Sequence, residues 1–275
     1  MKLEDVRPAD CHARAQRLLV EVALIRDEMG RSEDARPVPE ITDARPRDVY
    51  FEALASWTKA DRLGSEIGVR SARFEHAPPA LKDLRPGHVI QVIDAVLAQV
   101  DAIKQRLQIT ERVPEPAVDA SRKPSDVLAT LIRVNRELSR ALERPFTPGD
   151  VYRTVALAAS YAARLGGHVE PAPFERRRKP THCYERLAAC HAALAKAIAK
   201  RGETAMASRG TPADVVPGDV YDLASLVLGE ISFLHSITPN AAPVHPFEPV
   251  VSGHRLPSHV DQLARTLEAQ LATIG

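Results

Sequence analysis

One position in a recurring short pattern carries side chains that could do chemistry. The pattern reads Pro, any residue, Asp or His, then Val or Cys, and it occurs eight times along the 275 residues. Asp and His bind metal ions and exchange protons in enzymes. If the eight segments run parallel, these side chains collect at one end of a bundle and could form a carboxylate and imidazole site. The eight residues are Asp10, Asp48, His88, Asp126, Asp150, His182, Asp219 and His259.

The same position also suits the first turn of an α-helix, and we favour this interpretation. Pro is tolerated in a first turn because its missing N–H is not needed there. Asp in that turn is stabilised by the helix dipole by about 0.3–1 kcal/mol, whereas a protonated His is disfavoured. We therefore expect the three histidines to be neutral. Two registers remain open: the residue after Pro is the N-cap, or Pro is the first helical residue (N1) and Asp or His the third (N3).

The residues that follow each pattern predict a helix. Apolar or small residues recur four, seven, eleven and fourteen positions after the Val or Cys, as in Val89, Ile93, Val96, Val100 and Ile103. This spacing places one apolar stripe on one helix face, which we call the seam. Ser56 is the visible exception. Eight of the 22 prolines begin these segments and none falls inside one. We predict an all-α fold, an eight-helix repeat array.

The connections between the predicted helices are long and rich in proline. They share related stretches with apolar residues: Val38-Pro39-Glu40-Ile41, Val113-Pro114-Glu115-Pro116, 169–174 and Val244-His245-Pro246-Phe247. Such segments favour extended polyproline II structure, in which about ten residues span the length of a 20-residue helix. We expect these linkers to return along the helices, so that consecutive helices run parallel.

The eight patterns divide evenly about the middle of the chain. Four lie before residue 144 and four after it. This predicts two tandem four-helix-bundle-like halves, residues 1–143 and 144–275. The short connection 143–147 favours a hairpin across that boundary. One continuous eight-helix domain therefore remains the alternative.

Cys183, Cys190 and His191, with His182 beside them, form the only cluster of Cys and His in the sequence. Both cysteines occupy seam positions, where free Cys behaves as a small buried apolar residue. Core packing is the favoured interpretation and metal or redox chemistry the alternative. No Glu-x-x-His motif of di-iron bundles occurs, nor any phosphate-binding, zinc-protease or nucleophile-elbow motif. The basic run Arg176–Lys179 is interpreted as a solvated linker, with a phosphate or an acidic partner as the alternative.

Composition narrows the function classes. Lys and Arg number 37 and Asp and Glu 36, so there is no general attraction to nucleic acid. No apolar run approaches the roughly 18 residues that span a bilayer. No secretory signal is visible at the N-terminus, although a leader removed earlier would leave the same sequence. The three cysteines are not a disulfide framework, which favours the cytoplasm.

These observations predict a non-enzymatic helical repeat protein that acts as a scaffold or protein-interaction module. Its partner is expected to be a protein, and self-association stays open. No cofactor is expected. The alternative is a helical bundle that binds a metal ion or a small molecule. Its candidate ligands are His88, His182, His259, Asp150, Asp219, Cys183, Cys190 and His191.

Overall fold

The computed structural model describes residues 2–38, 40–70, 80–244 and 253–274. Within these ranges it contains eight α-helices, two short 3-10 helices and no strand, so the predicted all-α fold is confirmed. The α-helices are α1 (Pro8–Glu28), α2 (Pro46–Glu66), α3 (Pro86–Arg106), α4 (Pro124–Ala141), α5 (Pro148–Arg164), α6 (Pro180–Ala199), α7 (Pro217–Ser236) and α8 (Pro257–Ile274). The 3-10 helices are η1 (Leu3–Asp5) and η2 (Leu81–Asp83).

Every α-helix begins at the proline of the recurring pattern. Pro is therefore N1 and the Asp or His is N3, which decides between the two registers. Gly166, which directly follows the C-cap residue of α5, has a φ of 96°, a left-handed conformation that suits a residue just past a helix end.

The predicted seam forms the core of each bundle. The Val or Cys of all eight patterns is buried, as are the residues four, seven and eleven positions later. Ser56, the polar exception in the seam, is buried too, and its hydroxyl donates to the carbonyl oxygen of Glu52 at 3.1 Å. The 4-3-4 spacing thus marks the buried face correctly, including the position where the residue is polar.

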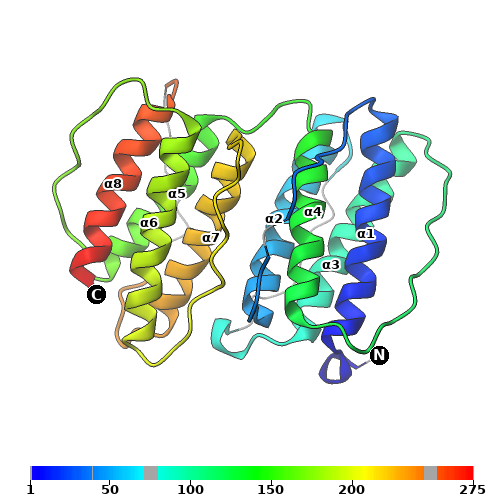
Figure 1. Cartoon of the computed structure of the whole chain (residues 1–275), viewed down its shortest axis with the longest axis horizontal. Coiled ribbons are helices and arrows are strands. Elements are labelled where there is room, and N and C mark those ends of the chain that lie inside the picture. Colours follow the sequence, from blue (N-terminus) through cyan, green and yellow to red (C-terminus); the bar gives the residue numbers. More distant parts are fainter. Residues whose placement is uncertain (1, 39, 71–79, 245–252, 275) are drawn as a thin grey trace. The chain divides into compact units, whose positions relative to one another are not determined.

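The chain divides into two compact units, Met1–Pro145 with α1–α4 and Phe146–Gly275 with α5–α8. In the first unit, α1 and α2 each pack against α3 and α4. In the second unit, α5 and α6 each pack against α7 and α8. Consecutive helices of a pair, such as α1 and α2, therefore lie diagonally opposite each other in a square of four (Figure 1).

The four helices of each unit run parallel. In the first unit, the thiol of Cys11 at the start of α1 donates to the carbonyl oxygen of Pro86 at the start of α3. The start of α2 is likewise joined to the start of α4, because Ala44 N donates to Ser125 Oγ at 3.1 Å. In the second unit, the first residues of all four helices line one hollow.

The long connections of the first unit are hydrogen-bonded to its helices. Asp34 N, between α1 and α2, donates to Glu137 Oε1 of α4 at 3.4 Å. Between α3 and α4, Lys104 Nζ donates to the carbonyl oxygen of Glu111 at 2.6 Å. Pro39 lies outside the described residues.

The second unit holds its connections in a similar way. Between α5 and α6, the carbonyl oxygen of Gly167 accepts from Gln270 Nε2 of α8 at 3.0 Å. Between α6 and α7, Met206 N donates to Glu230 Oε1 of α7 at 2.7 Å. The stretch His245 to Phe247, part of the last predicted linker, lies outside the described residues. No helix in the described parts of the chain has the length and apolar character needed to cross a membrane.

Candidate functional site

The eight predicted Asp and His side chains all hold the start of their own helix. Each accepts a hydrogen bond from the backbone N–H of its N-cap residue, through Oδ2 of Asp or Nδ1 of His. The donor–acceptor distances lie between 2.8 and 3.1 Å. In His88, His182 and His259 the accepting atom is the ring nitrogen Nδ1. This is half of the capping-box arrangement, and in α5 Thr147 Oγ1 completes it by accepting from Asp150 N.

The parallel helices place four of these side chains at one end of each unit. They do not converge on a metal site, because the described residues contain no group of three or more His, Cys, Asp or Glu side chains arranged to hold a metal ion. What gathers at these ends is instead a set of four helix N-termini, each with its partial positive charge.

The N-cap residues make the two ends chemically different. In the first unit all four are basic: Arg7, Arg45, Arg85 and Lys123. In the second unit they are Thr147, Lys179 and two apolar residues, Val216 and Leu256. Val216 and Leu256 are 44% and 47% exposed, so both apolar side chains face solvent at the helix starts.

A small hollow of about 60 Å³ lies between the four helix starts of the second unit. Its walls are the N1 proline and the following seam residue of each helix, and all of them are apolar: Pro148, Val151, Pro180, Cys183, Pro217, Val220, Pro257 and Val260. A methyl or a short aliphatic group fits this volume, and the hollow offers no charged or hydroxyl group for catalysis.

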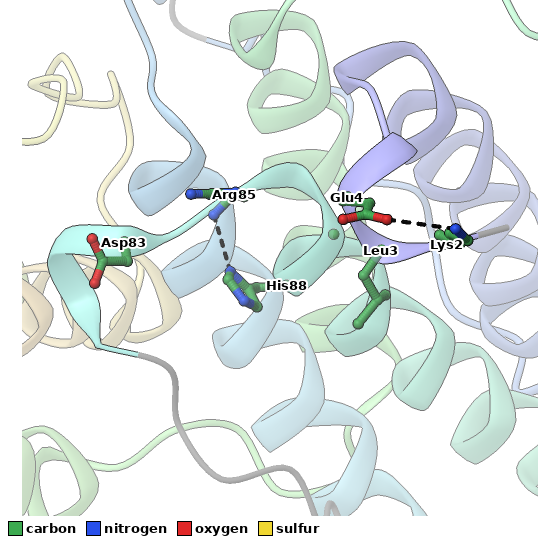
Figure 2. A pocket seen from close by; sticks show the side chains of 7 residues that line it. Lys2, Leu3, Glu4, Asp83, Arg85 and His88 are labelled. Carbon is green, nitrogen blue, oxygen red and sulfur yellow. Dashed lines mark hydrogen bonds and ion pairs between the residues drawn. The ribbon is translucent and has the colours of Figure 1, made fainter.

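A larger open hollow of about 740 Å³ lies in the first unit between η1 and the start of α3. Figure 2 shows His88 turned back to the backbone N of Arg85, and Lys2 beside Glu4. The side chains that line this hollow include both positive and negative charges. Gly87 lets η1 lie close to the start of α3, because a Cβ at this position would lie 2.2 Å from the carbonyl oxygen of Leu3.

Cys183 and Cys190 are buried free thiols on α6. Burial, and then the charge of Asp261, raise the pKa of Cys183 to about 12, and burial followed by Glu268 raises the pKa of Cys190 further. The thiol groups donate to carbonyl oxygens of α8, those of Pro257 and Ala264. Since the thiolate is the nucleophile and the metal ligand, both cysteines are held in the unreactive form.

His191 lies next to Cys190 on α6 and is only 5% exposed. Burial, and then the nearby Arg209, lower its pKa to about 4, so the ring is neutral at neutral pH. Its Nε2 makes no hydrogen bond within the described part of the chain. His191 is thus a buried neutral base. It lies on a different face of α6 from the seam, which holds the two thiols.

A polar cluster in the core of the first unit was not predicted from the sequence. Glu52 and Lys59 of α2 and Asn135 of α4 are 2%, 0% and 0% exposed. Asn135 Nδ2 donates to Glu52 Oε1 at 2.6 Å and to the Glu52 carbonyl oxygen at 3.0 Å. Lys59 Nζ donates to the carbonyl oxygen of Asn135 at 3.0 Å. The one available signal was the polar Ser56 in the seam between Glu52 and Lys59.

Two buried ion pairs also lie in the interior of the first unit. Lys104 of α3 pairs with Glu21 of α1, and Arg26 of α1 pairs with Glu137 of α4. Each pair also bonds to a linker. Lys104 donates to the carbonyl oxygen of Glu111, and Glu137 accepts from the backbone N–H of Asp34. Each ion pair therefore joins two helices and one linker at a single point.

Comparison of the chain with known proteins found no matching family model, no matching curated protein and no matching solved structure.

Proposed function

We propose that this chain is a non-enzymatic scaffold that binds an acidic protein segment. The binding site lies at the end of the second unit where its four helices begin. The observation that carries the proposal is an apolar hollow between four helix starts, which are preceded in the chain by exposed apolar and basic side chains. We call this surface the docking face and define it by the hollow together with Phe174, Val216, Leu256 and the basic residues Arg176, Arg177 and Lys179.

The apolar part of the docking face is unusual for a helix start. Val216 and Leu256 stand at N-cap positions, where Ser, Thr, Asp and Asn are preferred. Phe174 is 45% exposed, and its ring centroid lies 5.1 Å from that of His259 in the first turn of α8. Two exposed apolar N-cap residues thus directly precede prolines that line the apolar hollow, and a third exposed apolar side chain contacts the first turn of α8. Exposed apolar groups beside an apolar hollow are typical of a site that receives a partner's side chain.

The charge around the hollow selects the partner. Arg176, Arg177 and Lys179 are exposed just before α6, and Lys179 is the N-cap residue of that helix. Four helix N-termini add partial positive charge at the same end. Asp150 and Asp219 reduce this potential, but each is bound to an N-cap N–H. An acidic segment that carries one apolar side chain is complementary to this surface.

The Asp, His and Cys side chains that could act in catalysis already have structural roles, which supports a binding role over a catalytic one. All eight Asp and His side chains cap helices, and the thiols of the second unit are protonated and buried. A surface that binds through shape, apolar contact and charge requires none of them as an acid, a base or a nucleophile.

Fluorescence anisotropy with synthetic peptides tests the proposal. The probe is a labelled glutamate-rich peptide with one central leucine, and the two comparison peptides replace that leucine by serine or the glutamates by lysines. We expect binding of the first peptide, with about tenfold weaker binding after Leu256→Ser because a partly buried aliphatic contact of about 1.4 kcal/mol is lost. Val20→Ser is the matched control, since Val20 is an exposed aliphatic residue on α1 of the first unit.

Equal binding of all three peptides, or an affinity that Leu256→Ser leaves unchanged, contradicts the proposal. A loss of binding that occurs equally with Val20→Ser would locate the contact outside the docking face and contradict it as well. Raising the salt concentration should weaken the wild-type complex, because the basic residues are solvent-exposed.

A further inference from the structure

The polar cluster of the first unit brings an amine, a carboxamide and a carboxyl group together away from water. Lys59 Nζ contacts Asn135 through its backbone oxygen, and Glu52 Oε1 contacts the side-chain nitrogen of the same asparagine at 2.6 Å. All three residues are buried between α2 and α4. Ser56 does not compete for the carboxyl group, because its hydroxyl donates to the backbone oxygen of Glu52.

These are the groups that the formation of an amide bond between side chains requires. An unprotonated amine is the nucleophile, the carbonyl carbon of a carboxamide is the electrophile, and a carboxyl group delivers a proton to the departing nitrogen. Fixed proximity replaces a collision, and the exclusion of water prevents hydrolysis of the carboxamide. Glu52 already contacts Nδ2, the atom that would leave.

We propose that Lys59 and Asn135 form an intramolecular isopeptide bond that joins α2 to α4, with Glu52 as the proton carrier. A proton passes from the Lys59 ammonium to the Glu52 carboxylate, which leaves both groups neutral. The Nζ lone pair attacks Cγ of Asn135 and forms the N–C bond. Glu52 delivers its proton to Nδ2 and takes up the proton released from Nζ. The Cγ–Nδ2 bond breaks, and one ammonia molecule leaves. No oxidant or other reactant is needed.

The second unit provides an internal comparison because its equivalent positions lack these groups. Counted from the Val or Cys of each pattern, Glu52, Lys59 and Asn135 correspond to Arg186, Ala193 and Glu268. Arg186 and Glu268 form an ion pair at 2.7 Å with partly exposed side chains. Neither a lysine amine nor an asparagine carboxamide occurs at these positions, so the bond is expected in the first unit alone.

The mass of the purified full-length chain tests the proposal directly. After incubation of the folded protein at neutral pH, intact-mass spectrometry under denaturing conditions should give the sequence mass minus one ammonia. A chain that keeps its full sequence mass overturns the proposal, and this result does not depend on any variant folding.

Peptide mapping then places the bond. Trypsin does not cleave after an acylated lysine, so the expected product is Asp48–Arg62 joined to the short peptide Val134–Arg136. Loss of ammonia from any other residue, with free Lys59 and Asn135 peptides, would contradict the assignment. The linked residues lie 76 positions apart, so no single tryptic peptide can imitate the product.

Substitution of the proton carrier separates chemistry from simple proximity. Glu52→Gln keeps the size and a hydrogen-bonding group beside Nδ2, and it should leave the chain at its full mass. Lys59→Arg, which removes the nucleophilic amine, should do the same. Circular dichroism checks that each variant is folded, and a folded Glu52→Gln chain that still loses ammonia at the wild-type rate would overturn the role of Glu52. The outcome is independent of peptide binding at the docking face.

Discussion

The two units share one helix arrangement but differ in what they bury beside the seam. The clearest difference lies ten residues after the Val or Cys of each pattern. In the first unit this position is polar and buried in all four helices: Glu21, Lys59, Gln99 and Glu137. In the second unit the corresponding residues are Tyr161, Ala193, Glu230 and Gln270, of which the last two are buried.

The position matters in both units because it holds the linkers. Glu137 and Glu230 accept from linker N–H groups, and Gln270 donates to a linker carbonyl oxygen. Parallel helices require long returning connections, whose backbone groups need partners once they are covered. Polar side chains in the middle of α4, α7 and α8 provide such partners.

The first unit adds full charges to this arrangement. A buried ion pair contributes little net stability when intact, since desolvation offsets its attraction, but it is costly to break. The first unit should therefore be more sensitive than the second to a change at the shared position. We infer that its charges fix which linker packs on which helix.

The largest expected effect comes from truncating the matched residues Glu137 and Gln270. Glu137→Ala leaves Arg26 buried without this partner and should lower the free energy of unfolding by about 3–5 kcal/mol. Gln270→Ala removes a neutral hydrogen bond to Gly167 and should cost about 1–2 kcal/mol. Hydrogen exchange resolved by unit measures both, and the fluorescence of Trp57, the single tryptophan, follows the first unit. Equal costs would remove the distinction between the units.

Acid should affect the second unit through His191. Its pKa is lowered to about 4 in the fold, below the usual value of about 6.5, so the neutral ring contributes stability above pH 6.5 that is lost as the pH falls toward 4. At pH 5 the loss is about 2 kcal/mol. Denaturation at pH 7 and pH 5 should show this loss in the wild type and not in His191→Leu. A variant with the same pH dependence as the wild type would refute the assignment.

The glycines at the second helical position (N2) of α3 and α5 offer a matched pair of substitutions. Replacing one by alanine should lower the stability, and replacing the other should raise it. Gly87→Ala places a Cβ against the Leu3 carbonyl oxygen and should cost about 1–2 kcal/mol as η1 is displaced. Gly149→Ala at the start of α5 meets Thr147 Oγ1 at 3.4 Å and should stabilise by up to about 1 kcal/mol. Thermal unfolding measures both changes. Stabilisation by both substitutions would show that η1 contributes nothing to the first unit.

Much of the fold could be predicted because its determinants are local. Pro at N1, Asp or His at N3 and the apolar seam from Val89 to Ile103 each follow from the geometry of a single helix. The role of the three histidines at helix starts was also predicted, and each accepts the N-cap N–H through Nδ1. The order of packing was beyond this reasoning, because diagonal placement of α1 and α2 depends on how the linkers cross.

The polar residues beside the seam show where sequence reasoning stopped. Lys59 and Glu137 look like solvated charges in a helical pattern, because Lys and Glu are almost never fully buried unless paired. Their partners, Asn135 and Arg26, lie on other helices more than 70 residues away. Only the three-dimensional structure brings them together. Ser56 in the seam was the sole local indication that this interior is polar.

The smallest expected effect tests the difference between the N-cap residues. Arg85 and Val216 occupy the same place before α3 and α7, and neither side chain accepts a hydrogen bond from the helix. Serine at either position can accept from the N3 N–H, as Thr147 Oγ1 does from Asp150 N at 3.3 Å, and should stabilise by about 0.5–1 kcal/mol. Arg85→Ser should gain a few tenths of a kcal/mol more, because it also removes a cation from the positive end of the dipole. Urea denaturation at low and high salt measures this difference, which salt should abolish. If the two gains are equal at low salt, the basic N-caps of the first unit impose no electrostatic cost on its helices.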